Sequence, residues 1–324
     1  MTRAIRFTRT GGPEVLELEE IALSAPQPGE ALVRQRVIGV NFIDTYHRSG
    51  LYPVPLPSGL GSEAAGVVEQ VGPGVTCIRV GERVAYAGAG APAAYAEARL
   101  APADRLVPLP DDISDEVAAA GLLKGMTAEF LIHRTFPVVP GQTVLFHAAA
   151  GGVGLIACQW LSKLGARVIG TVGSQQKREL ALCHGCQEVI VLDQEHFPER
   201  VRELTGGHGV PVVFDSIGKV TFMDSLDCLE PRGMLVSFGN ASGKPEPFDL
   251  ALLAQKGSLY VTRPTLFSYV ATREALLASA NSLFQAIREG LKIEIGQRFP
   301  LAQAAVAHRA LESRSTTGST LLEP

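Results

Sequence analysis

The segment that most constrains the fold is a glycine-rich turn, His147–Gly154, set between an apolar run at Val144–Phe146 and a helix-periodic stretch at Leu155–Leu164. Three of its residues hold the positions that are usually glycine in a dinucleotide-binding fingerprint: Ala149, Gly151 and Gly154. A pyrophosphate must come close to the bare N–H groups at a helix start, and a side chain at Gly151 would stand in the way. Ala149 keeps this geometry if its φ is negative. The alternative is a strand-to-helix turn without a ligand.

The alternation of strand-like and helix-like segments around this turn predicts a parallel sheet covered by helices. Apolar runs rich in β-branched residues recur, each followed by a helix-periodic stretch, at Val144–His147, Arg167–Val172, Glu188–Leu192, Val212–Asp215 and Met234–Phe238. Such repeated strand-helix units indicate a doubly wound α/β domain of the Rossmann type.

The two ends of the chain follow a different pattern. Up to about residue 125, short apolar segments alternate with Gly-Pro turns, which favours a mainly antiparallel β domain. After Pro264 the sequence predicts two helices, Thr272–Leu291 and Leu301–Ser313, that return to the N-terminal part. We therefore expect a substrate domain from residues 1–125 and 264–324, with a cofactor domain at 126–263 inserted in it.

The second strand of the cofactor domain indicates which dinucleotide binds. NAD enzymes of this type carry an acidic residue about 20 residues after the turn, where it holds the ribose 2′-hydroxyl. Here the strand ends Gly173-Ser174-Gln175-Gln176-Lys177, and no carboxylate precedes Glu179. Ser174 and Lys177 suit a 2′-phosphate, so NADPH is favoured over NADH. The alternative is a helix cap followed by a solvated lysine.

The chain resembles the zinc-free quinone oxidoreductases of the medium-chain dehydrogenase/reductase superfamily, the group that includes zeta-crystallin, and most of all their bacterial members. The resemblance runs from end to end. It is carried by the turn at 149–154 and by Gly39–Tyr46, Ser49–Pro53, Gly61–Gly66, Val236–Asn240 and Gly257–Pro264. It implies a GroES-like substrate domain around the Rossmann domain.

The resemblance also implies a set of site residues. Contacts to NADPH would come from Asn41, Tyr46, Lys124, Phe130, Gly152, Val153, Gly173, Ser174, Lys177, Leu192, Ile217, Phe238, Gly239, Asn240, Ala241, Pro264, Thr265, Leu266 and Arg314. Leu192 stands where the bacterial relatives are expected to have tyrosine, and it is equally consistent with a core position. Catalytic roles would fall to Tyr46, Asn41 and Tyr52, with Lys124 and Arg263 as cations near the substrate; Tyr52 is equally consistent with packing beside Pro53.

Zinc enzymes of the superfamily resemble this chain but place cysteine near Asn41 and histidine at Ser62, and asparagine and serine do not replace those ligands. We therefore expect no metal. Cys183-His184-Gly185-Cys186 has a metal or redox spacing but lacks a second pair and a helix N-terminus, so a packing role is favoured.

The composition limits the partners. A formal charge of −4 provides no field that would attract nucleic acid or an anionic membrane. The five cysteines are odd in number, and no apolar leader segment precedes the first strand, so we expect a cytoplasmic protein with reduced thiols. The resemblance implies a homodimer joined through the exposed sheet edge at Gly257–Arg263.

These expectations converge on metal-independent reduction of a quinone by NADPH, driven by positioning and by stabilisation of a developing oxyanion. Two other readings stay open. One is an NADPH-dependent reductase of conjugated alkenes, such as enones or enoyl thioesters, and the other is a non-enzymatic NADPH-binding or redox-sensing protein.

Overall fold

The computed structural model describes residues 1–313 and 316–324, which form two compact units. The first comprises Met1–Lys124, Val270–Phe284 and Ile293–Pro324, and the second comprises Gly125–Tyr269 and Gln285–Lys292. Pro264–Tyr269 therefore packs with the second unit. The domain boundaries at 125/126 and 263/264 stay predictions.

The second unit is built on a six-stranded sheet in which every pairing is parallel, in the order β11-β10-β9-β12-β13-β14. Numbered along the chain from β9, this is the 3-2-1-4-5-6 order of a Rossmann fold. The strands are β9 (Thr143–Phe146), β10 (Arg167–Val172), β11 (Glu188–Val191), β12 (Val210–Asp215), β13 (Leu229–Ser237) and β14 (Tyr260–Thr262). The sequence prediction of a doubly wound parallel sheet is confirmed.

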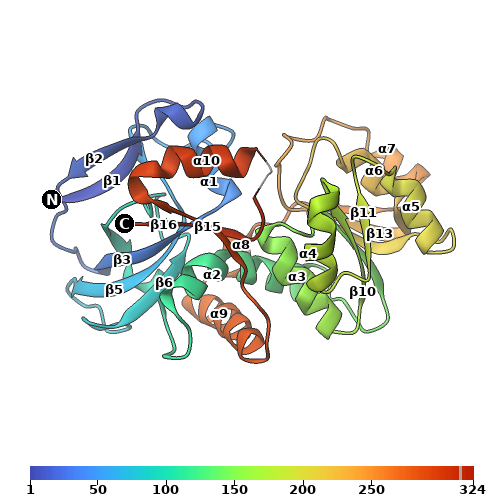
Figure 1. Ribbon diagram of the computed structural model, residues 1–324. Coiled ribbons are helices and arrows are strands. Elements are labelled where there is room, and N and C mark those ends of the chain that lie inside the picture. The colour runs from blue at the N-terminus through green and yellow to red at the C-terminus, as the bar shows by residue number, and fades with distance from the viewer. Residues whose placement is uncertain (314–315) are drawn as a thin grey trace. The chain divides into compact units, whose positions relative to one another are not determined.

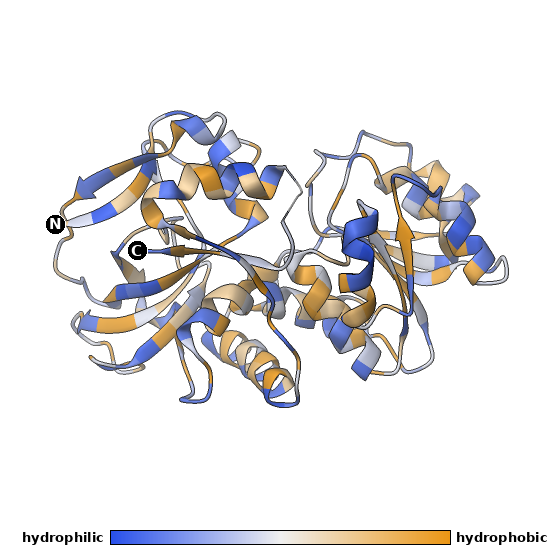
Figure 2. Cartoon of the chain, in the orientation of Figure 1, coloured by the Kyte–Doolittle hydropathy of each residue, from blue (hydrophilic) through white to orange (hydrophobic). Residues whose placement is uncertain are grey.

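Helices cover this sheet, with α3 and α4 following β9 and β10, and α5 and α6 following β11 and β12 (Figure 1). The helices of the unit are α3 (Gly152–Lys163), α4 (Arg178–Cys183), α5 (Phe197–Leu204), α6 (Phe222–Asp227), α7 (Ala251–Gln255) and α8 (Leu266–Tyr269), with a 3₁₀ turn at Gln175–Lys177 and a π-helical turn at Leu131–Thr135. Beyond its first residue β10 is buried throughout, as expected for a strand covered on both faces, and hydrophobic colour runs along the sheet in Figure 2.

The first unit is mainly antiparallel. A seven-stranded sheet runs β15-β16-β3-β5-β6-β8 with β7 paired to β3, and a three-stranded sheet runs β2-β1-β4. Only β15 and β16 pair in parallel within these sheets, as far as the described residues go. The strands are β1 (Thr2–Phe7), β2 (Glu17–Ile21), β3 (Glu30–Val40), β4 (Ser58–Gly59), β5 (Glu63–Val71), β6 (Arg83–Ala87), β7 (Ala98–Pro102), β8 (Val107–Pro108), β15 (Ile295–Pro300) and β16 (Ser319–Glu323).

The tail contains more than the two expected helices. Helices α9 (Arg273–Arg288) and α10 (Ala304–Glu312) are present, the latter after a 3₁₀ turn at Leu301–Gln303, but β15 and β16 were not predicted. Strand β16 pairs with both β15 and β3, and its Leu321 and Leu322 are fully buried. The last residues of the chain therefore complete the sheet of the first unit.

Two helices of the first unit carry predicted site residues. Helix α1 (Phe42–Ser49) follows β3 directly, and α2 (Asp115–Phe130) follows a turn after β8. Helix α1 was not predicted, although Asp44 at its third position accepts a hydrogen bond from the N–H of the cap residue Asn41 (2.9 Å) and Gly50 ends it with a φ of +83°. An Asn-x-x-Asp pattern before a Gly is a recognisable helix signature.

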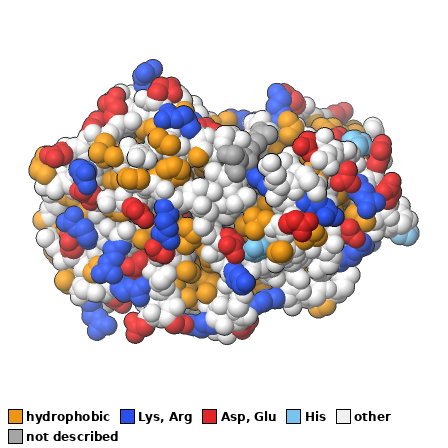
Figure 3. All heavy atoms as spheres, in the orientation of Figure 1, with side chains coloured by type: hydrophobic (Ala, Val, Ile, Leu, Met, Phe, Trp, Pro, Cys, Tyr) orange, Lys and Arg blue, Asp and Glu red, His pale blue; other side chains and the backbone are white. Residues whose placement is uncertain are grey.

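The structure offers no membrane span: in the described part of the chain no helix is both long and apolar enough to cross a bilayer. On the face drawn in Figure 3, basic and acidic side chains are interspersed rather than gathered by sign.

Candidate active site

The glycine-rich turn closes directly onto the sheet, and backbone hydrogen bonds hold it there. The N–H of His147 donates to the carbonyl of Phe214, and the N–H of Ala149 donates to that of Thr171 (both 2.9 Å). The left-handed residue of the turn is Ala148, with a φ of +54°, whereas Ala149 is not among the residues with a positive φ. The condition placed on Ala149 by the sequence is therefore met.

Gly151 and Gly154 need to be glycine for different reasons. A Cβ at Gly154 would lie 2.3 Å from the carbonyl oxygen of Ala148 and 2.7 Å from that of Ala149, so this glycine allows the turn to close. A Cβ at Gly151, the N-cap of α3, would come no closer than 3.1 Å to its nearest neighbour. A larger side chain at Gly151 would instead extend beside the bare amides at the start of the helix.

The turn after β10 supplies groups of the kind a phosphate needs. Ser174 precedes the 3₁₀ turn at Gln175–Lys177 with an extended backbone, and its side chain makes no capping hydrogen bond. Burial lowers the pKa of Lys177 from its ordinary value, since desolvation disfavours the charged form. A phosphate beside this half-buried ammonium would offset that cost. Next to them Gly173 is exposed, and a Cβ there would meet no atom within 4 Å.

The third loop at this edge of the sheet follows β12. Asp215 is fully buried and accepts hydrogen bonds from Ile217 N (2.7 Å), Gly218 N (3.2 Å) and Thr221 Oγ1 (2.8 Å). This carboxylate therefore shapes the loop. The loops after β9 and β10 together offer helix amides, a hydroxyl and an ammonium, which fit a dinucleotide diphosphate with a further phosphate on its ribose.

Arg263 was expected to be a cation near the substrate. In the structure its side chain holds a loop of the second unit through hydrogen bonds to the backbone. Its Nη1 donates to the carbonyls of Ser237 (3.1 Å) and Gly239 (2.8 Å), which fixes the loop after β13. That loop contains the predicted contacts Phe238, Gly239, Asn240 and Ala241. A Cβ at Gly239 would lie 2.3 Å from the carbonyl oxygen of Ser216, so the loops after β12 and β13 pack tightly.

The remaining predicted contacts in the second unit range from buried to exposed. Phe130 is 1% exposed and stacks on Tyr269 at 4.4 Å between ring centroids. Leu192 is half-buried against the core of the parallel sheet, in line with its packing alternative. Leu266 is buried, Pro264 is half-buried and Thr265 is exposed. Arg314 lies outside the described residues.

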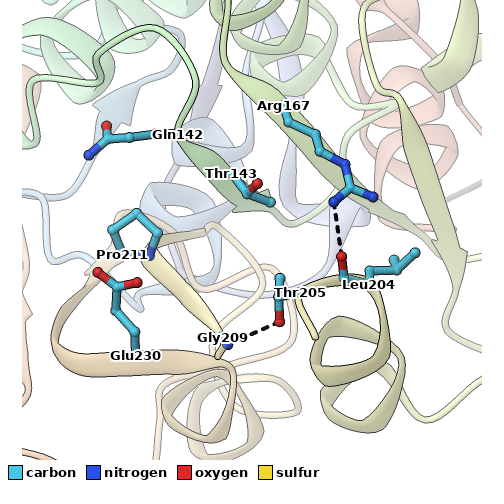
Figure 4. Close-up of a pocket in the computed structure, with 8 residues that line it drawn as sticks. All are labelled: Gln142, Thr143, Arg167, Leu204, Thr205, Gly209, Pro211 and Glu230. Carbon is cyan, nitrogen blue, oxygen red and sulfur yellow. Dashed lines mark hydrogen bonds between the residues drawn. The ribbon is translucent and has the colours of Figure 1, made fainter. Parts of the chain in front are cut away.

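A pocket of about 420 Å³ lies in the same unit but is not this site (Figure 4). Its lining includes Thr143 and Arg167, the first residues of β9 and β10, together with Glu230 of β13. These lie at or near the amino ends of their strands, whereas ligands of open α/β sheets bind outside the carboxyl ends.

In the first unit, the predicted catalytic residues lie on or next to helix α1. Asn41 precedes the helix, and Tyr46 is 8% exposed and meets Tyr52 edge-on at 5.1 Å between ring centroids. The N–H of Tyr52 donates to the carbonyl of Tyr46 (3.0 Å). The structure thus brings the two tyrosines into contact and places Asn41 at the start of the same helix as Tyr46.

Asp44 anchors helix α1 through buried hydrogen bonds, and the sequence analysis did not predict this role. Its carboxylate is fully buried and accepts hydrogen bonds from Asn41 N (2.9 Å), Ser62 Oγ (2.9 Å) and Tyr95 OH (3.1 Å). Burial raises its pKa to about 6, although these hydrogen bonds and Lys124 act in the opposite direction. Asn41 and Ser62, at the positions expected to hold zinc ligands in other members of the superfamily, are engaged in this network.

The hydrogen bonds behind Asp44 have a fixed direction. Arg48 approaches Nδ1 of His308 at 3.1 Å, and an arginine only donates, so Nδ1 accepts and Nε2 carries the hydrogen. Nε2 then donates to the hydroxyl oxygen of Tyr95 (3.1 Å), whose own hydrogen goes to Asp44. Burial and the charge of Arg48 lower the pKa of His308 to about 3, which keeps it neutral.

Two further features of the sequence concern metal binding and the spacing of Cys183 and Cys186. Within residues 1–313 and 316–324, no group of three or more His, Cys, Asp or Glu side chains is placed to hold a metal ion. Cys183 is exposed and Cys186 is buried, and both are free thiols. Cys186 hydrogen-bonds with Cys158 of α3, which raises the pKa of Cys158 well above its ordinary value.

Comparison with known proteins places this geometry in a family. An alcohol dehydrogenase GroES-like domain matches residues 27–111, and a domain described as zinc-binding dehydrogenase matches residues 152–279. The chain is 56% identical to a quinone oxidoreductase of Pseudomonas aeruginosa over 100% of both chains. The chain belongs to the quinone oxidoreductases of the medium-chain dehydrogenase/reductase superfamily.

Two further relatives describe the range of this family. The Escherichia coli quinone oxidoreductase, solved in complex with NADPH, superposes with a TM-score of 0.98 at 51% identity, covering 99% of this chain and 100% of that one. A 2-haloacrylate reductase from Burkholderia sp is 46% identical over 100% of this chain and 99% of its own. The GroES-like and Rossmann prediction is confirmed for this chain.

We predict that Gly151→Val and Gly154→Val fail in different ways. Gly151→Val should keep the fold with a loss of stability below about 1 kcal/mol, since its Cβ would lie 3.1 Å from the carbonyl oxygen of Ala148, and should raise the Kd for NADPH and NADH beyond about 1 mM because its side chain blocks the helix amides. Gly154→Val should lower the stability by roughly 1–3 kcal/mol, because its Cβ overlaps two carbonyls. Coenzyme fluorescence and scanning calorimetry measure the two effects. Tight binding by Gly151→Val would contradict the assignment.

A second prediction concerns Asp44. Its pKa of about 6 lies above the ordinary value of 3.8, so the folded state holds this proton more tightly than the unfolded chain. The stabilisation is therefore complete below about pH 4 and is lost as the pH rises through 6, by about 3 kcal/mol. The difference in the free energy of urea unfolding between wild type and Asp44→Asn should show this slope.

The exposed Asp104 offers a matched control. Asp104→Asn, compared with wild type over the same pH range, should give a difference without that slope. A flat difference for Asp44→Asn would show that Asp44 has no raised pKa.

Proposed function

We propose that this chain catalyses the NADPH-dependent reduction of quinones without a metal. The observation that carries the proposal is full-length similarity to quinone oxidoreductases together with a Rossmann turn whose second strand ends in Ser174 and Lys177 rather than a carboxylate. NADPH, when bound, supplies two electrons and one proton as a hydride equivalent, and a second proton from water completes the hydroquinone.

The cofactor assignment rests on charge at one turn. Lys177 is half-buried and Ser174 leaves its hydroxyl outside any cap bond, so together they offer one cation and one donor to a 2′-phosphate. A ribose 2′-hydroxyl in the same place carries no negative charge and would gain less from an ammonium at this position. We therefore infer that NADPH binds more tightly than NADH.

The chain's own part in the reaction is positioning. We propose that Asn41, Tyr46 and Tyr52 contact the substrate, with the tyrosine hydroxyls as donors to the oxygen that gains negative charge. Tyr46 is held by the edge-on contact with Tyr52, and Asn41 is held through its backbone by Asp44. Groups whose rotamers are fixed in advance stabilise charge without reorganising during the reaction.

A second candidate is the reduction of conjugated alkenes, which the similarity to a 2-haloacrylate reductase favours. The two reactions need almost the same donors. Steady-state assays with benzoquinone, phenanthrenequinone, crotonyl-CoA and an alkyl vinyl ketone separate them by kcat/KM. NADPH binding without turnover of any of these would instead support a non-enzymatic NADPH-binding or redox-sensing protein.

We also propose a homodimer built on the free edge of the parallel sheet. Strand β14 ends the strand order, its Tyr260 is 58% exposed, and an unpaired edge of this kind readily adds a strand from a symmetry mate. For the cell, we propose a cytoplasmic location, in keeping with the free thiols of all five cysteines. Fractionation of cells tests the location.

We predict that Lys177→Ala separates the two coenzymes. Loss of one charged phosphate contact should raise the Kd for NADPH roughly 10- to 100-fold and change that for NADH by less than about threefold. Lys163→Ala, which removes an exposed lysine at the other end of α3, is the control. Equal weakening of both coenzymes by Lys177→Ala would remove the 2′-phosphate assignment.

For the dimer, light scattering should give the wild type the mass of two chains and Tyr260→Asp the mass of one, because two like charges would face each other near the symmetry axis. Val220→Asp introduces the same charge at another exposed apolar residue and should leave the mass unchanged. A wild-type mass of one chain would refute the dimer.

A further inference from the structure

Glu63, the first residue of β5, is a buried carboxylate to which the function proposed above assigns no role. It is 0% exposed, and in the register of the sheet it pairs with Gly39 of β3 and Ala87 of β6. The space for its side chain depends on Gly39, because a Cβ there would lie 2.6 Å from Glu63 Oε2. A charge at this depth requires compensation from groups that reach it.

Three donors from two helices provide that compensation. Asn41 Nδ2 donates to Oε2 at 2.8 Å, the N–H of Leu123 donates to Oε1 at 2.6 Å, and Lys124 Nζ donates to Oε2 at 3.3 Å. Asn41 is the cap of α1, and Leu123 and Lys124 belong to α2. One carboxylate therefore joins the start of β5 to both helices that carry predicted site residues in this unit.

The contacts with Glu63 determine which atoms Asn41 and Lys124 can offer to a substrate. Because the amide nitrogen of Asn41 is directed at Glu63, its Oδ1 must lie on the opposite side of the amide group. Lys124 has a side chain only 7% exposed and directs one of its three hydrogens at the same carboxylate oxygen. An acceptor and a cation are thereby held beside each other, each in one orientation.

We propose that Glu63 is a positioning residue that holds the Lys124 ammonium toward the substrate oxygen that becomes negative during reduction, and that fixes the Asn41 amide so that its Oδ1 is presented as an acceptor. The proposal rests on the function proposed above and deepens it. A buried ion pair contributes little to stability compared with an apolar pair of the same size, so it is better explained by a demand for a fixed charge. Lys124 then supplies the positive charge, and Glu63 determines where that charge lies.

The test compares Glu63→Gln with wild type in steady-state kinetics and in coenzyme binding. Glu63→Gln keeps the shape of the side chain but no longer attracts both donors to one oxygen. We expect kcat with benzoquinone to fall at least about 10-fold while the Kd for NADPH, measured by fluorescence, changes less than about threefold. Asp115→Asn, which removes the carboxylate at the start of α2 that pairs with Arg36 and Arg83, is the control and should keep the wild-type kcat.

A double-mutant cycle separates positioning from a merely structural role. In a Lys124→Gln background the charge that Glu63 holds is gone, so adding Glu63→Gln should lower kcat less than about threefold further. The Glu63→Gln, Lys124→Gln protein also removes both buried charges, which keeps the test available if the single variant does not fold. Thermal midpoints of all variants report folding independently of activity.

The outcomes distinguish the two levels of the proposal. If Glu63→Gln retains the wild-type kcat, or if the two losses simply multiply, Glu63 does not act through Lys124 and the inference is overturned. If the wild type itself does not turn over quinones, the proposed function fails. The wild-type assay shows this independently of the Glu63 variants.

Discussion

The close approach of helix α3 to the strands beneath it is the constraint on which the cofactor unit depends. The helix begins directly at the sheet because Gly154 has no side chain to strike the carbonyls of Ala148 and Ala149. Ala148 takes the left-handed conformation that reverses the chain, and the N–H of Ala149 reaches β10. With any other side chain at Gly154, the turn would open and the bare amides would move away from the strand ends. The other two loops, after β10 and β12, are useful only in relation to that fixed helix start.

In the first unit the corresponding constraint is electrostatic. Asp44 and Glu63 are both fully buried, and each accepts three hydrogen bonds from groups on different elements. Leaving such a carboxylate partly unsatisfied costs far more than the net gain from one ordinary hydrogen bond, so the surrounding groups have little freedom to move. Rigidity of Asn41 and Lys124 follows from this. The chain uses buried charge to hold polar groups where other members of the superfamily are expected to hold a metal.

Local patterns allowed the cofactor unit to be predicted, and long-range contacts prevented the same for the first unit. Strand, turn and helix at 144–164 lie within some twenty residues, so hydrophobic period and glycine placement are enough. The network behind Asp44 joins Arg48 to His308, which are 260 positions apart, and no periodicity connects them. Strands β15 and β16 were not predicted either, because they are short and lie on either side of the helix-periodic segment Leu301–Ser313. Helix α1 could have been predicted from Asn41, Asp44 and Gly50, whereas the role of Glu63 needs the sheet register that brings it beside Gly39.

The role of the glycine-rich turn at 147–154 can be tested directly by one crystal structure. In crystals of the protein grown with NADPH, we expect the pyrophosphate within hydrogen-bond distance of the backbone amides of Gly152 and Val153, at the start of α3. The 2′-phosphate should lie against Ser174 and Lys177. An ordered NADPH whose pyrophosphate makes no contact with the start of α3 would contradict the central role given to this turn.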